Sequence, residues 1–524
     1  MEATAQEVDA TVTAAHAARD ALADRTVRAA FLRTAADRLE ARRDQLVEVA
    51  DAETALGPVR LTGELARTCY QLRAFAGIVD EGAFLDVVID HPDDTATPPV
   101  PDLRRHKVPL GVVAVYSASN FPFAFSVPGG DTASALAAGC PVVVKAHPDH
   151  PALSELVAKV LRDAAAEHGV PAGVLGLVHG FDAGLELIRH PLVAAAGFTG
   201  SVRGGRALFD EAAARPVPIP FHGELGSLNP VVVTEAAAAE RAEAIGTGLA
   251  GSMTLGVGQF CVKPGLVLVP SGAAGDGLVK SLTDAVSNTD PGVLLDHRMR
   301  DNFVRGVAER GPAARGGLPG DAGRGRRAHR QRRVPHRPGQ PARRRRRARP
   351  AAGGVLRPGD RRRPLRGRRR GRGRALPAAR QPHRDRPAVR GRGSGRGKGA
   401  RLLAELTPLA GRVVVNGWPT GVAVAPAQHH GGPYPATTST STSVGGHRHR
   451  ALAAPRRLPE RPRGPAPAGA ARRQPARPSP PCRRPPGTLT APRFPGARRG
   501  DARNRERGRG TDPREPTVPL RPRE

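Results

Sequence analysis

The sequence predicts an α/β fold with a parallel sheet over residues 108–197, on two observations. Short apolar runs of strand length alternate with helix-like segments, an alternation typical of parallel strands joined by right-handed crossovers. Polar residues also stand where such strands end, namely Asn120, Lys145 and Thr199. Ligands bind outside the carboxyl ends of parallel strands. We therefore expect these three side chains to lie along one site.

The elements follow in chain order. Residues 1–77 have apolar positions at helical spacing and are expected to form scaffold helices, and the Pro/Asp/Thr-rich segment 90–102 is expected to be a loop or hairpin edge. The strands of the sheet are expected at 112–116, 141–145, 174–178 and 193–197. The intervening helices are expected at 130–139, 151–168 and 182–189. A second domain is expected to begin with a strand at 231–233 and a helix at 236–251.

The turn at 198–206 is a candidate phosphate site. Thr199, Gly200, Ser201 and Gly205 combine hydroxyls and glycines with a helix N-terminus, whose N–H groups suit an anion. The pattern is not the usual glycine fingerprint, and an ordinary strand–helix turn is at least as good an interpretation of this motif alone. Its place at the same sheet edge favours the phosphate site.

Cys261 is the candidate nucleophile. It stands among small and turn-forming residues just before the apolar run 266–269, which predicts a thiol on a loop leading into a strand. A thiol attacks as thiolate and needs a nearby base or donor groups. The segment from His222 to Pro230, which contains Glu224, supplies a candidate base. Taken alone, a cysteine in an apolar stretch is more often a small core residue.

The length and the cysteine content indicate the size class and the compartment of the protein. The chain has 524 residues, enough for two or three domains, and 4 cysteines without regular spacing, which argues against a disulfide framework and a zinc site. No signal peptide and no long apolar run are visible. We expect a cytoplasmic protein with free thiols and no membrane segment.

The net charge of +33 divides unevenly along the chain. Residues 1–311 carry 27 Lys and Arg against 38 Asp and Glu, whereas residues 312–524 carry 54 against 10. The net charges are therefore −11 and +44. Two different kinds of sequence are joined near residue 311.

The segment 312–400 is dominated by Arg, Gly, Pro and Ala and contains no Glu, Phe, Tyr, Ile or Thr. Without apolar periodicity it is expected to be disordered. These four residue types have GC-rich codons, so a GC-rich gene translated in a shifted frame would give this mixture. A folded pattern returns at 401–445, and the tail 446–524 has the foreign composition again.

Five motifs occur in the order and rough spacing of aldehyde dehydrogenases, which the chain resembles. They are Ser119-Asn120-Phe121-Pro122, Val143-Val144-Lys145-Ala146-His147-Pro148, Phe198-Thr199-Gly200-Ser201, Glu224-Leu225-Gly226 and Gly258-Gln259-Phe260-Cys261. The branch it is most similar to is the NADP-dependent 2,5-dioxopentanoate (α-ketoglutaric semialdehyde) dehydrogenases. Segments 416–422 and 429–437 resemble that branch too.

The resemblance implies roles for the predicted site. Cys261 would form a thiohemiacetal and then a thioester, the Asn120 amide would stabilise the oxyanion, and Glu224 would activate the hydrolytic water. Lys145 would hold the adenosine ribose and its phosphate. The implied substrate is a small-molecule aldehyde, with the branch's semialdehyde as the expected one.

The implied cofactor is NADP, with NAD possible. Many aldehyde dehydrogenases have a glutamate three residues after the lysine, where this chain has Pro148. A carboxylate there would repel a 2′-phosphate, so its absence favours NADP, with Lys145 and His147 left to meet the phosphate. The family also implies a homo-oligomer, a dimer or tetramer.

The resemblance divides the chain as follows. We expect N-terminal helices and a dinucleotide-binding domain at 1–229, the first part of an α/β catalytic domain at 230–311, the Arg-rich segment at 312–400, a remnant of the catalytic and oligomerisation region at 401–445, and a basic tail at 446–524. The family's second glutamate, in a Glu-x-Phe-Gly-Pro-like motif, should fall inside 312–400, which contains no Glu.

Alternatives stay open for this chain. It could be a catalytically impaired or dead dehydrogenase fold because of the missing glutamate motif. Less favoured is a nucleic-acid or polyanion binder acting through the Arg-rich segments, because they have few aromatic residues for base stacking, and no specific nucleic acid is expected. No metal site is expected, since His222 and the adjacent His429 and His430 have no ligand partner at suitable spacing.

Overall fold

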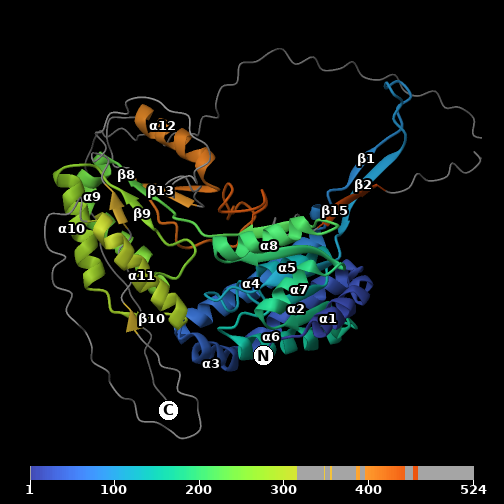
Figure 1. The fold of residues 1–524 in the computed structure, drawn as a ribbon. Helices are drawn as coiled ribbons and strands as arrows, with labels where there is room; N and C mark the ends of the chain where they lie inside the picture. Colours follow the sequence, from blue (N-terminus) through green and yellow to red (C-terminus); the bar gives the residue numbers. More distant parts are fainter. Residues whose placement is uncertain are drawn as a thin grey trace, which may run out of the picture. The chain divides into compact units, whose positions relative to one another are not determined.

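The computed structural model describes residues 2–314, 347–348, 354–356, 385–389, 396–442 and 453–457. Four helices open the chain (Figure 1): α1 (Ala5–Ala17), α2 (Arg25–Ala41), α3 (Arg43–Thr54) and α4 (Pro58–Glu81). Side chains of Thr4 and Asp24 accept hydrogen bonds from the first turns of α1 and α2, and proline begins α4. The predicted N-terminal helices are confirmed.

The first sheet has five strands in the order β5-β4-β3-β6-β7, and every neighbouring pair is parallel. The strands are β3 (Val112–Tyr116), β4 (Val142–Lys145), β5 (Leu175–Val178), β6 (Val193–Thr199) and β7 (Phe221–Glu224). The predicted parallel sheet is confirmed. β7 was not predicted, because prolines and a glycine interrupt the apolar pattern around it.

Helices cover both faces of this sheet. Along β3, Val113 and Val115 belong to a core shared with α2 and α4, whereas Val112 and Ala114 belong to a second core shared with α1. Successive side chains of a strand point to opposite faces, so a continuous apolar run is what a sheet buried on both sides requires. The crossover helices are α5 (Gly130–Ala138), α6 (Pro151–Ala166), α7 (Phe181–Arg189) and α8 (Val202–Ala214).

An antiparallel hairpin precedes β3 in the chain. β1 (Val88–Asp90) pairs antiparallel with β2 (Leu103–Pro109), and β15 (Ala453–Arg457) pairs with the other edge of β2. The segment 90–102, expected to be a loop or a hairpin edge, includes the last residue of β1 and connects it to β2.

The second sheet has the order β12-β9-β8-β13-β14, and it is parallel throughout. Its strands are β8 (Val231–Val233), β9 (Leu266–Leu268), β12 (Gly354–Leu356), β13 (Asp385–Val389) and β14 (Arg412–Val415). Helices α9 (Glu235–Thr254) and α10 (Ala273–Ser287) bury their apolar faces with β8 and β9. The chain continues through α11 (His297–Ala314), the pair β10 (Gly292–Val293) and β11 (Arg347–Ala348), and α12 (Arg396–Leu406).

Most of 312–400 and 446–524 lies outside the described residues, so the predicted disorder and the predicted frame change stay predictions. The described exceptions include β12 and β13, whose main-chain groups pair with the second sheet although their segment lacks apolar periodicity. In the part of the chain that the structure describes, no helix is both long and apolar enough to cross a bilayer.

Candidate active site

Cys261 lies on the loop between a 3-10 turn at Leu255–Gly258 and strand β9, as predicted. Gly256, Val257 and Gly258 all have positive φ, at 58°, 59° and 72°. A β-branched residue is rare in this left-handed region, and such strained backbone tends to be kept at functional sites. The Cys261 side chain is partly accessible, whereas Cys69 and Cys140 are buried. Among the described cysteines, Cys261 alone can meet a substrate.

Asn229 binds the Cys261 loop through its side-chain amide. It is fully buried, and its Nδ2 donates to the carbonyls of Cys261 (2.8 Å) and Lys263 (3.1 Å). Ser227 Oγ donates to Asn229 Oδ1 (2.8 Å), which fixes the amide orientation. The loop is therefore held at the nucleophile residue and two residues after it.

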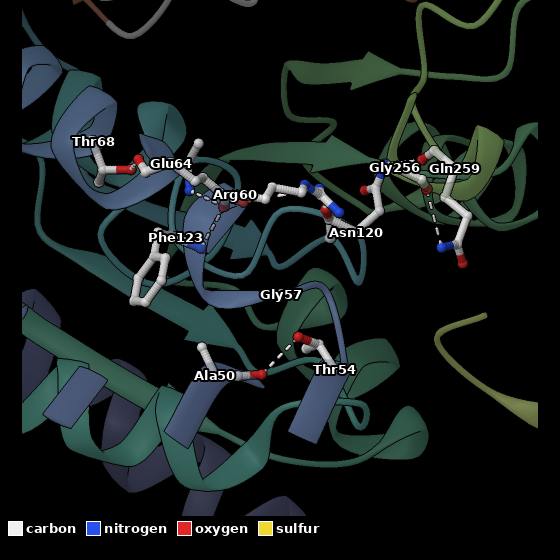
Figure 2. Close-up of polar contacts among 12 residues, drawn as sticks. Ala50, Thr54, Gly57, Arg60, Glu64, Thr68, Asn120, Phe123, Gly256 and Gln259 are labelled. Atoms are coloured by element: carbon white, nitrogen blue, oxygen red, sulfur yellow. Dashed lines mark hydrogen bonds and ion pairs between the residues drawn. The ribbon is translucent and has the colours of Figure 1, made fainter. Parts of the chain in front are cut away.

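Asn120 reaches the same loop from the first sheet. Its Nδ2 donates to the carbonyl of Gln259 at 2.7 Å (Figure 2), two residues before the thiol. The side-chain amide predicted to bind an oxyanion thus contacts the loop of the candidate nucleophile.

Arg60 of α4 connects the two loops. Its guanidinium donates to the carbonyl of Asn120 and lies over the rings of Phe121 and Phe260, 5.0 and 4.8 Å from their centroids. Figure 2 shows Arg60 extending from the helix toward Asn120. The two rings are in contact, with centroids 5.1 Å apart, and a cation over both attracts each of them. Arg60 therefore ties the residue after Asn120 to the residue before Cys261.

Glu64, one turn further along α4, anchors the Asn120 loop. Its Oε1 accepts the backbone N–H groups of Phe123 (2.8 Å) and Ala124 (3.0 Å), and its Oε2 lies 3.9 Å from Arg60. Burial raises the pKa of Glu64 to about 7, although the two N–H donors and the charges of Arg60 and Arg67 oppose this shift.

Glu224 ends β7 and is only 2% exposed. Thr437 Oγ1 donates to Glu224 Oε1 at 2.7 Å, and the main chains of these two residues form a β-bridge. His430 Nδ1 lies 3.8 Å from the other oxygen, Oε2, and His430 Nε2 lies 3.9 Å from Cys261 Sγ. The imidazole of His430 therefore lies between the Glu224 carboxylate and the Cys261 thiol.

Lys145 is the last residue of β4 and is buried, with its Nζ 4.8 Å from the centre of the Phe181 ring. Burial lowers the pKa of Lys145. Burial, followed by the charges of His150 and Lys145, lowers the pKa of His147 to about 3, so His147 is neutral near pH 7. A phosphate would therefore meet one cation here, together with a neutral donor.

A carboxylate already faces Lys145. Glu2 Oε1 accepts the N–H groups of Asp182 (2.8 Å) and Ala183 (3.3 Å) in the first turn of α7, and its charge interacts with that of Lys145. Position 148 is proline and carries no charge, but Glu2 of the N-terminal segment places a carboxylate near Lys145 instead.

The turn after β6 combines binding and packing features. Thr199 ends the strand, Ser201 caps α8 by accepting the N–H of Gly204 (3.1 Å), and the N–H of Gly200 donates to the carbonyl of Glu224 (2.9 Å). A Cβ at Gly205 would lie 2.0 Å from a methyl carbon of Leu225 and 3.0 Å from the Phe198 ring of β6, so these two side chains pack closely over the glycine.

These residues fit a dinucleotide. A buried cation at the end of β4 and a helix N-terminus at the end of β6 flank β3, beside the point where the strand order reverses. Within the described residues, no group of three or more His, Cys, Asp or Glu could hold a metal ion.

The family model for the aldehyde dehydrogenase family matches residues 1–300. The chain belongs to this family. Alpha-ketoglutaric semialdehyde dehydrogenase 2 of Azospirillum brasilense is 44% identical over 432 residues, covering 80% of this chain and 79% of that protein. Alpha-ketoglutaric semialdehyde dehydrogenase of Acinetobacter baylyi is 39% identical over 467 residues, covering 85% and 84%.

Solved structures agree on the fold. Glyceraldehyde-3-phosphate dehydrogenase of Methanocaldococcus jannaschii, complexed with NADP, matches with a TM-score of 0.66 at 16% identity, covering 87% of this chain and 95% of that one. As an aldehyde dehydrogenase, the protein is an oxidoreductase that oxidises a small-molecule aldehyde to the acid with a nicotinamide dinucleotide.

The sequence prediction missed several residues of this aldehyde dehydrogenase site. Arg60 and Glu64 were assigned to an ordinary scaffold helix, although their spacing of four residues places them on one helix face. No catalytic role was predicted for Asn229, Thr437 or His430. His430 is the histidine that contacts the thiol, although its sequence context indicated only a metal ligand, which was rejected.

Proposed function

We propose that this protein oxidises the semialdehyde 2,5-dioxopentanoate, or a close analogue, with NADP, using Cys261 as the nucleophile. One observation carries the proposal: the accessible thiol lies on a loop that touches the Asn120 amide on one side and reaches the Glu224 carboxylate through His430 on the other. A nucleophile, an amide donor and a base thus converge on one loop.

In the proposed first step, Cys261 Sγ bonds to the aldehyde carbon and the carbonyl electron pair moves to oxygen. An amide nitrogen carries two N–H groups, and one from Asn120 already donates to Gln259. Its second N–H, together with the backbone N–H of Cys261, would stabilise the negative oxygen.

The bound dinucleotide supplies a hydride acceptor, which leaves a thioester on Cys261. Glu224 then takes a proton from water as the water attacks the thioester carbon and releases the acid. Thr437 fixes one oxygen of this carboxylate and directs the other toward the thiol side. Lys145 would hold the adenosine ribose and its phosphate, and Ser201 with the first turn of α8 would face the pyrophosphate.

The semialdehyde assignment draws on the names of the two relatives and on charge. Arg60 and Arg67 stand on the face of α4 toward the Asn120 loop, and the charge of Arg67 interacts with Cys261. Burial lowers the pKa of Arg67, but a guanidinium remains charged in proteins. An aldehyde with a carboxylate at its far end is therefore favoured over a neutral one.

The first experiment tests the nucleophile. Cys261→Ala should abolish aldehyde oxidation while NADP binding and the circular dichroism spectrum stay unchanged. Glu224→Gln should release one equivalent of NADPH in a burst and then stall at the thioester. Turnover that survives in the Cys261 variant would disprove the assignment.

The second experiment tests the substrate class. Arg67→Met should lower kcat/KM for 2,5-dioxopentanoate about 10-fold to 100-fold more than kcat/KM for pentanal, because both substrates use the thiol near Arg67 but only the former carries a carboxylate. Equal losses on both aldehydes would show that Arg67 is not the anchor.

The cofactor preference is measured as the ratio of kcat/KM for NADP and NAD. A preference for NADP is expected because position 148 is proline and Lys145 is available. A clear preference for NAD would overturn this part of the proposal.

We also propose a homo-oligomer, a dimer or tetramer, in the cytoplasm, as the family and the free thiols favour. Sedimentation of the purified chain checks the oligomeric state. A second candidate function is a dehydrogenase fold without turnover, which the absence of glutamate from 312–400 favours. Binding of NADP without oxidation of any aldehyde would support that candidate.

A further inference from the structure

We infer that His430 is a further catalytic residue, which accepts the proton of the Cys261 thiol and is itself oriented by Glu224. This inference rests on the proposed role of Cys261 as the nucleophile. It adds an imidazole between two groups that the proposed mechanism otherwise uses separately.

The geometry of the ring supports the inference. Nε2 lies 3.9 Å from Cys261 Sγ, within reach of a hydrogen bond to sulfur, and Nδ1 lies 3.8 Å from Glu224 Oε2. The two ring nitrogens therefore face different groups, a thiol and a carboxylate. His430 is 3% exposed and Glu224 2%, so water screens this line of groups only weakly.

The surroundings hold the backbone of His430 and orient the carboxylate of Glu224. The backbone N–H of His430 donates to Thr442 Oγ1 at 2.9 Å, and Thr437 Oγ1 donates to Glu224 Oε1 at 2.7 Å, so that Oε2 faces the ring. A Cβ on the next residue, Gly431, would lie only 3.3 Å from Glu224 Oε1. Glycine thus lets the chain carrying His430 pass close to the carboxylate.

The chemistry follows from the tautomer. A carboxylate facing Nδ1 favours the proton on that nitrogen, which leaves the Nε2 lone pair toward the thiol. As the sulfur–carbon bond forms, the S–H bond breaks and its proton moves to Nε2. The resulting imidazolium lies between the substrate-bound sulfur and the negative Glu224, which stabilises its charge. Once that proton has left to solvent, Glu224 can serve as the base for water.

A histidine that only fills space would be replaceable by glutamine, which has similar volume and hydrogen-bonding capacity but no basic nitrogen. The test is therefore the rate of Cys261 alkylation by iodoacetamide at pH 7, on the full chain, followed by mass spectrometry of the Cys261 peptide. Cys69 and Cys140 are buried and serve as internal references. Only the thiolate reacts with the reagent, so the rate reports the proton acceptor without requiring turnover.

His430→Gln should slow alkylation by at least about tenfold, whereas the control His429→Gln, at the neighbouring half-buried position, should leave the rate unchanged. Glu224→Gln should slow it by a smaller factor, because the ring remains but loses its orienting charge. An unchanged rate in His430→Gln overturns the inference. If His430→Gln does not fold, an unchanged rate in Glu224→Gln overturns it instead.

The outcomes separate this inference from the proposed function. Alkylation that depends on His430 in a protein without aldehyde turnover would contradict the proposed function and leave the inference intact. Normal turnover with alkylation independent of His430 would contradict the inference and leave the proposed function intact.

Discussion

Replacing Glu64 with glutamine is expected to make the stability of the protein less sensitive to a rise in pH. The carboxyl is buried, and one oxygen accepts both backbone N–H groups of the Asn120 loop. Glutamine keeps a carbonyl oxygen for those two donors, but it cannot ionise. The substitution therefore isolates the free energy of burying the charge.

The magnitude follows from the pKa. Burial raises the pKa of Glu64 from 4.5 to about 7. Because the folded pKa is the higher one, the folded state binds the proton more tightly. The stabilisation is fully present below the unfolded pKa and is lost as the pH rises through 7. With about 1.4 kcal/mol for each pKa unit, the wild-type protein should lose about 2–3 kcal/mol between pH 5 and pH 8.5.

The assay is urea unfolding of wild type and Glu64→Gln at both pH values, followed by circular dichroism. The difference in unfolding free energy between the two proteins should shift by about 2–3 kcal/mol in favour of glutamine at pH 8.5. Glu53→Gln is the matched control, since Glu53 also accepts two backbone N–H groups, from Ala152 and Leu153. A shift for Glu64→Gln no larger than for the control would refute the reasoning.

Three further predictions concern the nucleophile loop, the cofactor and the gene. Asn229→Ala removes two hydrogen bonds to the Cys261 loop, each worth about 1 kcal/mol. It should lower kcat about tenfold with little change in KM for the cofactor. An unchanged kcat would show that the loop keeps its conformation without these two bonds. Glu2→Gln should raise the NADP to NAD ratio of kcat/KM several-fold, because a negative charge beside Lys145 is removed, and an unchanged ratio would place the 2′-phosphate elsewhere. The gene translated in its other frames between codons 311 and 446 should yield a Glu-x-Phe-Gly-Pro-like motif, and its absence from all frames would contradict the frame change.

The first sheet was predictable because its signals are local. An apolar run such as 112–116 is long enough for one buried strand, and the polar residues after each run mark the carboxyl edge. Asn120, Lys145 and Thr199 could therefore be placed at one edge before any contact was known. The Cys261 loop was likewise visible in its glycines and the strand that follows.

The supporting residues were not predictable, because their partners are distant in sequence. The pattern of α4 identifies a polar face but not whether that face meets water or, as for Glu64, a loop 59 and 60 residues away. His430 gains its meaning only from Cys261, 169 residues earlier. No local spacing reports such a contact.

The bridge between Glu224 and Thr437 also dictates when the active site can come into existence during synthesis. The two residues are 213 positions apart, so a nascent chain that has already made the whole first sheet still lacks the hydroxyl that orients its carboxylate and the imidazole beside its thiol. Contacts this remote form late, after the local ones. The dinucleotide-binding sheet can thus assemble on the ribosome well before the protein is able to attack an aldehyde. A polypeptide released before residue 430 would retain the thiol of Cys261 but not the imidazole beside it or the hydroxyl that orients Glu224.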